Sequence, residues 1–246
     1  MSRFESWWSL PYNDSVFAYY KSKYNPIYPE YPFNLAVSSL VNELPPGFQK
    51  LAQKGKIALD LLTVLRNIVA YHAWSNTYDL RLRTSLLSAA PQNKRYCDFW
   101  EACSCLLVPG PSFEKYLCFA LLLYCLNTFS PRRSHLSASH MAFGTPRQLL
   151  TQKLPTFNES SEDETECLIW IWLVLIDSWR AVNGAHSEAA AALLLQFAEC
   201  FPSYCVWAKI EYVLGQFFAT DCMVADIRRC WTLWPAPLAF MTDGER

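Results

Sequence analysis

The sequence predicts an all-α protein, an irregular multi-helix bundle of about eight to ten helices around a buried central helix near residues 162–182. Three observations predict this fold class. The 246 residues include only seven Gly, fewer than an all-β protein with many tight turns needs. Apolar residues make up 52% of the chain and charged residues 17%, which is enough for a large core. Apolar positions recur at helical intervals, and no stretch repeats at a fixed period, so a helical solenoid is not expected.

The start of the chain is expected to form an extended arm over residues 1–34. This stretch is rich in aromatic residues and Pro and lacks a sustained period, and Pro restricts its own backbone and that of the preceding residue. One short helix is expected near residues 14–23. The rings of the arm should pack on the remainder of the chain, 35–246, which is expected to be one all-α regulatory domain.

Pro and Gly delimit the helices that are expected in the first half of the chain. Pro45, Pro46 and Gly47 are expected to separate the first two helices, and Gly55 to end the second. Ser112 is expected to cap the last helix of this half, which is apolar on most faces. The expected helices span residues 35–44, 48–53, 57–75, 85–90, 93–108 and 113–128.

The central helix is expected over residues 161–183. Ser161 can serve as its N-cap, with Glu164 at the spacing of a capping box. Three further acidic residues place negative charge near the positive end of the helix dipole, namely Glu162, Asp163 and Glu166. The next ten residues, 167–176, are all apolar, so the helix should be buried on every face and Trp172→Ala should be strongly destabilising. Asp177 and Arg180 are expected to tie helix ends together.

The remaining helices flank the central one. Two short, weak helices are expected at 135–143 and 146–154. Three stronger helices follow at 187–201, 204–218 and 221–234. The first of these is rich in Ala and Leu, has high helix propensity and should end at Pro202, while Pro235 should close the last.

Composition and charge exclude several classes of function. The first 30 residues contain no apolar core followed by a small-residue cleavage site, so no secretory signal is predicted. The longest apolar runs, 116–126 and 167–176, are shorter than the ~18 residues of a membrane span, so an intracellular protein without membrane contact is expected. A net charge of −1 and a pI of about 6.4 provide no basic field for nucleic acid. The basic pairs Arg132-Arg133 and Arg228-Arg229 are interpreted as solvated helix ends.

No catalytic, cofactor-binding or metal-ligating residue is predicted. The ten Cys form no CxxC pair and lie mostly in apolar helical stretches, where Cys behaves as a small hydrophobic residue. His135 and His140 are five residues apart, unlike the two His of a zinc-hydrolase helix, and His72 is expected in the core. The common hydrolase, dinucleotide and P-loop signatures are not present in the sequence.

Three stretches, in this order, resemble the large regulatory domain of fungal-specific transcription factors. They are residues 44–65, with an LPPGF turn and a Leu-rich helix, residues 166–180, and residues 207–231, which end in an RxxW element from Arg228 to Trp231. The resemblance implies a nuclear regulatory domain that acts through protein partners or a small apolar effector and that can form homodimers. The family's DNA reader holds zinc in a six-Cys cluster. This chain lacks that pattern, so zinc and DNA contact are expected only through a separate or missing segment.

Two functions from different classes are therefore considered. The first is a transcription-regulatory domain that works by interaction and not by catalysis. The alternative is an all-α enzyme with an apolar cavity, similar to a terpene cyclase, in which the acidic run of residues 162–166 would hold Mg²⁺ around a diphosphate. Such enzymes carry a second cluster on another helix, whereas here only Asn158 and Ser160 lie beside the acidic run. A charge-compensated helix start also explains that run.

Overall fold

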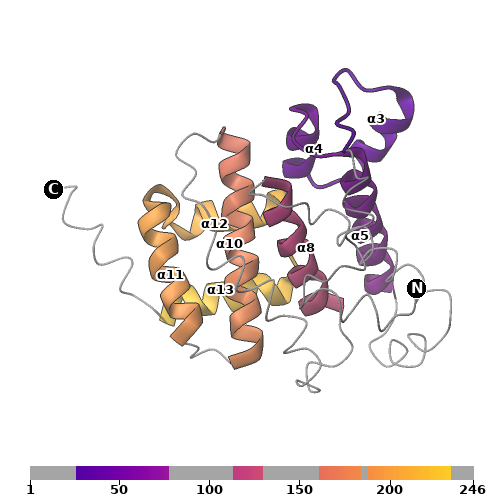
Figure 1. Ribbon diagram of the computed structural model, residues 1–246. Coiled ribbons are helices and arrows are strands. Elements are labelled where there is room, and N and C mark those ends of the chain that lie inside the picture. The colour runs from indigo at the N-terminus through magenta and orange to yellow at the C-terminus, as the bar shows by residue number, and fades with distance from the viewer. Residues whose placement is uncertain (1–25, 78–112, 130–160, 184–187, 234–246) are drawn as a thin grey trace, which may run out of the picture. The chain divides into compact units, whose positions relative to one another are not determined.

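The structure is a computed structural model, and it describes residues 26–77, 113–129, 161–183 and 188–233 (Figure 1). Of these residues 80% are helical and none lies in a strand, which confirms the all-α multi-helix fold. The chain divides into two compact units, residues 1–146 and 147–246. The sequence pattern does not predict this division. The proposed boundary between an arm over 1–34 and a domain over 35–246 stays a prediction.

Eight α-helices and one short 3-10 helix, η2, make up the described chain. The first unit contains α3 (Leu35–Asn42), α4 (Pro46–Gln53), α5 (Leu59–Thr77) and α8 (Phe113–Phe129). The second contains α10 (Glu162–Asn183), α11 (Glu188–Cys200), η2 (Pro202–Tyr204), α12 (Trp207–Gln216) and α13 (Asp221–Leu233). The helices expected at 14–23, 85–90, 93–108, 135–143 and 146–154 lie outside the described residues.

Pro46 begins a helix and does not stop one, which corrects the expected boundary. It occupies the first turn of α4, where its missing N–H costs no hydrogen bond, so this helix starts two residues before the expected position 48. The helix ends at Gln53, and Gly55 stops it as expected. Gly55 has a φ of +65°, its N–H donates to the Ala52 carbonyl over 2.9 Å, and the Lys56 N–H donates to the Leu51 carbonyl over 3.0 Å. These two bonds form a Schellman motif.

We expect Gly55→Ala to lower the free energy of unfolding by about 1 kcal/mol. A Cβ at this position would meet no atom within 4 Å, so the cost comes from the left-handed backbone alone. Gly215 in α12 is the matched control, because its added Cβ also meets open space and its backbone is helical. Gly215→Ala should therefore stabilise the protein by about 0.4–1 kcal/mol. Urea denaturation measures both, and a loss of stability at both positions would contradict this account.

A carboxylate from α8 completes the start of α5. Glu114, only 9% exposed, accepts the Ala58 N–H at Oε1 over 2.6 Å and the Tyr28 hydroxyl at Oε2 over 2.5 Å. The Leu59 N–H donates to the Ile27 carbonyl over 2.8 Å. Two of the N–H groups that a helix start leaves without intrahelical partners are thus satisfied from elsewhere in the first unit. This cap places the start of α5 at Leu59, two residues after the expected position.

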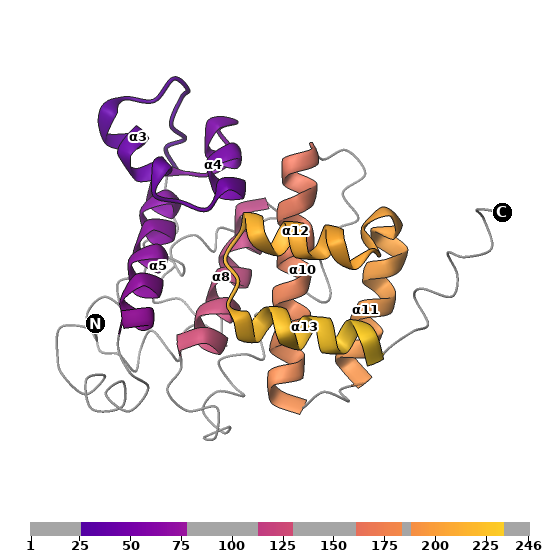
Figure 2. The ribbon, with the colours of Figure 1, turned by 180° about the vertical axis from the view of Figure 1, so that it is seen from behind.

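The buried central helix is confirmed. Every residue from Glu166 to Ser178 in α10 is buried, and α11, α12 and α13 pack against it. Figure 2 shows α12 and α13 lying across α10. Trp170 is 0% exposed, donates its indole N–H to the Phe218 carbonyl over 2.7 Å and stacks on Phe217. Trp172, 3% exposed, packs edge-on against Phe197 of α11.

The capping box expected at the start of α10 does not form through Ser161. The Ser161 hydroxyl makes no hydrogen bond to any residue that the structure describes. The Ser161 carbonyl accepts both the backbone N–H and the hydroxyl of Thr165, over 2.9 and 3.1 Å. Ser161 therefore begins the helix through its backbone. The acidic residues of the first turn lie where the dipole favours them, as expected. Asp177 is buried, and the side chain of Arg180 lies outside the described part of the structure.

The single helix expected at 204–218 is instead a 3-10 turn followed by the shorter α12. Val206 is extended, which separates η2 from α12. Phe217 is extended as well, with a φ of −125° and a ψ of −172°, and this ends the helix at Gln216. The break brings the Phe217 ring and the Phe218 carbonyl to Trp170. Among the described residues, no helix is long and apolar enough to cross a membrane.

Candidate interaction surface

The acidic residues at the start of α10 lie beside η2. Burial raises the pKa of Tyr204, and the carboxylates of Glu166 and Glu162 raise it further. The Lys209 ammonium lies 5.4 Å from the centre of the same ring. Glu162 is exposed and Glu166 is buried, so the acidic residues do not share one environment. Across the described ranges, no group of three or more His, Cys, Asp and Glu side chains is placed to hold a metal ion.

Most of the described cysteines belong to the core, and His72 is half-buried. His72 shares a hydrogen bond of 2.6 Å with the Tyr124 hydroxyl, and burial lowers the pKa of its imidazole. Of the seven described cysteines, five are buried, and burial raises the thiol pKa of Cys125 and Cys167. These thiols are protonated and unreactive at neutral pH. His135, His140 and the pair Arg132-Arg133 lie outside the described residues.

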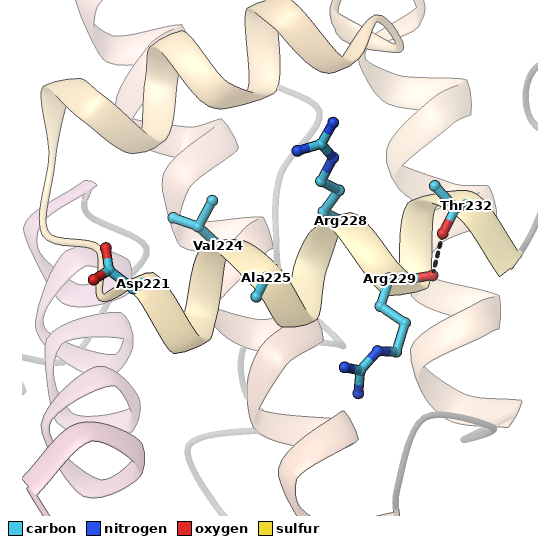
Figure 3. A pocket seen from close by; sticks show the side chains of 6 residues that line it. All are labelled: Asp221, Val224, Ala225, Arg228, Arg229 and Thr232. Atoms are coloured by element: carbon cyan, nitrogen blue, oxygen red, sulfur yellow. Dashed lines mark hydrogen bonds between the residues drawn. The ribbon is translucent and has the colours of Figure 1, made fainter.

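Helix α13 has a buried face and a polar, exposed face. Four apolar residues point inward at helical spacing, namely Met223, Ile227, Cys230 and Trp231. Thr220 caps the helix, since its hydroxyl accepts the Met223 N–H over 3.2 Å. The outer face consists of the six residues drawn in Figure 3, which we call the α13 stripe: Asp221, Val224, Ala225, Arg228, Arg229 and Thr232. The local pattern of apolar residues thus decides which side chains face the solvent.

The α13 stripe lines an open hollow of about 540 Å³. Its two arginines point to opposite sides of the helix (Figure 3). The guanidinium of Arg228 lies 5.5 Å from the centre of the Trp207 ring on α12, a cation–π contact. Arg229 is 61% exposed and lies 4.0 Å from Asp226, at the outer limit of an ion pair. Both arginines are exposed, as the sequence predicts, but they lie within α13 and not at its end.

Other exposed apolar side chains were missed by sequence reasoning. Val206, which precedes α12, and Tyr212 within α12 are 55% and 50% exposed. In the first unit, Ile27, Tyr31 and Leu35 are 67%, 65% and 92% exposed. Helical spacing could have identified Tyr212, because Ile210, Val213 and Leu214 occupy the buried face of α12. The exposure of Ile27 and Tyr31 depends on the path of an irregular segment before α3, which no periodicity predicts.

The chain was compared with models of protein families, with curated proteins and with solved structures, and none of the three comparisons finds a match.

Proposed function

We propose that this chain is a transcription-regulatory domain, similar to the regulatory domain of fungal-specific transcription factors, which acts by binding a protein or a small effector. The proposal places it in the nucleus and assigns it no catalysis of its own. Contact with DNA would come from a separate segment. The three stretches that resemble the family, 44–65, 166–180 and 207–231, support this function.

The observation that carries the proposal is the exposed surface of α12 and α13. Trp207 of α12 is half-buried against the exposed Arg228 of α13, and Tyr212 of α12 is 50% exposed. Trp, Tyr and Arg are the residue types that dominate binding energy at protein interfaces. The Trp207 ring and the Arg228 guanidinium already hold each other in place, which lowers the conformational entropy that a partner must overcome. This surface belongs to the third stretch of the resemblance.

A reporter experiment tests the proposed function. The full 246-residue chain would be fused to an unrelated DNA-binding domain and its effect on transcription of a reporter measured in fungal cells. We expect the fusion to change reporter output, and a Tyr212→Ala/Arg228→Ala variant of equal abundance and melting temperature to lose most of that change. Gln196→Ala, an exposed position on α11, is the matched control. A folded, abundant fusion without effect on transcription would contradict the proposal.

The alternative, a terpene-cyclase-like enzyme, leads to a different prediction, which can be tested on the same protein. A ligand that binds the native state raises the melting temperature by mass action. Mg²⁺ together with a prenyl diphosphate should therefore raise the melting temperature of a terpene-cyclase-like enzyme, and the Glu162→Gln/Glu166→Gln variant should lose that rise. The regulatory function predicts no shift for either protein.

A further inference from the structure

Two opposite charges on the α13 stripe have no ionic partner within the described chain. Asp221, the first residue of α13, forms no hydrogen bond or ion pair, and Thr220 already caps the helix. Arg228 contacts the Trp207 ring but no carboxylate. The two residues are seven positions apart, about 10 Å along the helix at 1.5 Å per residue. They lie on the same side of α13 but are too far apart to pair with each other.

These charges are arranged symmetrically about Ala225. Asp221 lies four residues before Ala225, and Arg228 and Arg229 lie three and four residues after it. If two copies of α13 pack antiparallel with Ala225 at the two-fold axis, the acidic end of each helix lies opposite the basic end of the other. A two-fold interface requires this self-complementarity, because each contact between two positions occurs twice.

We propose that the α13 stripe is the two-fold interface of a homodimer, in which Asp221 of each chain pairs with Arg228 of the partner subunit. This inference goes beyond the proposed function and does not depend on it. Ala225 is small enough at the axis for two helices to approach within the usual 8–10 Å. Val224, half-buried, adds apolar contact beside it.

The geometry of Arg228 suits it to this contact. Its cation–π contact with the Trp207 ring restrains the guanidinium, and the exposed side chain can still donate to a carboxylate. The hollow of about 540 Å³ along the stripe gives the side chains of the partner subunit space. Since one helix face buries little area, we expect a dimer with a dissociation constant in the micromolar range or weaker, and one that salt weakens further.

Charge exchange tests the interface on the full chain, with the mass measured by sedimentation velocity over a concentration series. D221R and R228E/R229E should each raise the dissociation constant about tenfold or more, because like charges then face each other. An equimolar mixture of the two variants should recover a heterodimer, since both facing pairs become opposite again. The triple variant D221R/R228E/R229E should recover a homodimer for the same reason. K209E, on the exposed face of α12, is the matched control, and thermal melting confirms that each variant is folded.

A cross-link locates the two-fold axis independently. In a C222S background, which removes the exposed thiol of α13, A225C should form a disulfide-linked dimer under mild oxidation, and adding D221R should slow its formation. A chain that stays monomeric up to about 1 mM would overturn the proposal. So would a dimer whose dissociation constant is unchanged in D221R and R228E/R229E, because its interface would then lie elsewhere. Since the assay measures mass and not transcription, its failure is distinguishable from failure of the proposed regulatory function.

Discussion

Trp170→Ala should lower the free energy of unfolding by about 3–5 kcal/mol, the range for removing a large aromatic side chain from a core. Trp170 is fully buried in α10, and its ring lies 5.9 Å from that of Phe217. The substitution leaves a cavity and also removes the hydrogen bond to the Phe218 carbonyl. Urea denaturation followed by circular dichroism measures the effect. A value below about 1 kcal/mol would show that α10 is not the centre of this unit.

A pair of Trp→Phe substitutions separates the hydrogen bond from the packing. Within the described ranges, the Trp172 indole N–H has no hydrogen-bond partner, whereas that of Trp170 donates to the Phe218 carbonyl. Both rings lose similar volume when replaced by Phe. Trp170→Phe should therefore cost about 1–2 kcal/mol more than Trp172→Phe, because only the former breaks a buried hydrogen bond. Equal costs would mean that this hydrogen bond does not stabilise the fold.

Glu114→Ala should be the second large effect, about 2–4 kcal/mol. The buried Ala58 N–H would lose its acceptor, and a buried donor without a partner costs roughly 1–3 kcal/mol before the loss of the Tyr28 contact is added. Glu114→Gln should cost less, since its amide oxygen can still accept one of the two bonds. Glu162→Gln, which alters an exposed carboxylate in a first helical turn, should cost less than about 1 kcal/mol. If Glu114→Ala and Glu162→Gln proved equal, the tertiary cap on α5 would be refuted.

The contact between Tyr28 and Glu114 should also make stability depend on alkaline pH. Burial raises the pKa of the Tyr28 phenol well above its usual value, and the hydrogen bond to Glu114 raises it further. The neutral phenol is thus favoured in the folded state, so this contribution is complete below about pH 10, the usual tyrosine pKa, and is lost as the pH rises above it. Tyr28→Phe should remove that part of the pH dependence. Chemical denaturation of both proteins between about pH 8 and pH 11 measures it.

Much of the fold followed from local patterns. The ten apolar residues from Cys167 to Ile176 predicted a helix buried on every face, and all ten are buried. Pro202 and Gly55 ended helices where expected, because the missing N–H of Pro and the left-handed φ of Gly act within a single turn. These features depend only on residues that are close in the sequence.

The candidate interface was only partly accessible to the same reasoning. The exposure of Arg228 and Arg229 followed from the apolar face on the opposite side of α13. The separation of seven residues between Asp221 and Arg228 is also visible in the sequence. It corresponds to about two helical turns and places both residues on one face of α13. Neither charge has an ionic partner among the residues that the structure describes, and this depends on which groups other helices place nearby. Trp207, the neighbour of Arg228, lies on α12.

Helix starts and breaks that depend on distant residues were decided by tertiary structure alone. Glu114 caps α5, a helix that begins far earlier in the sequence. The residue whose N–H it accepts, Ala58, lies 56 positions before it. The extended backbone at Phe217 is stabilised by Trp170, which lies in another helix. Ser161 matched a capping pattern, yet its hydroxyl makes no hydrogen bond within the described part of the chain. Helix propensity, burial period and Pro or Gly breaks are properties of short segments, whereas the partners of individual polar groups depend on how the helices pack.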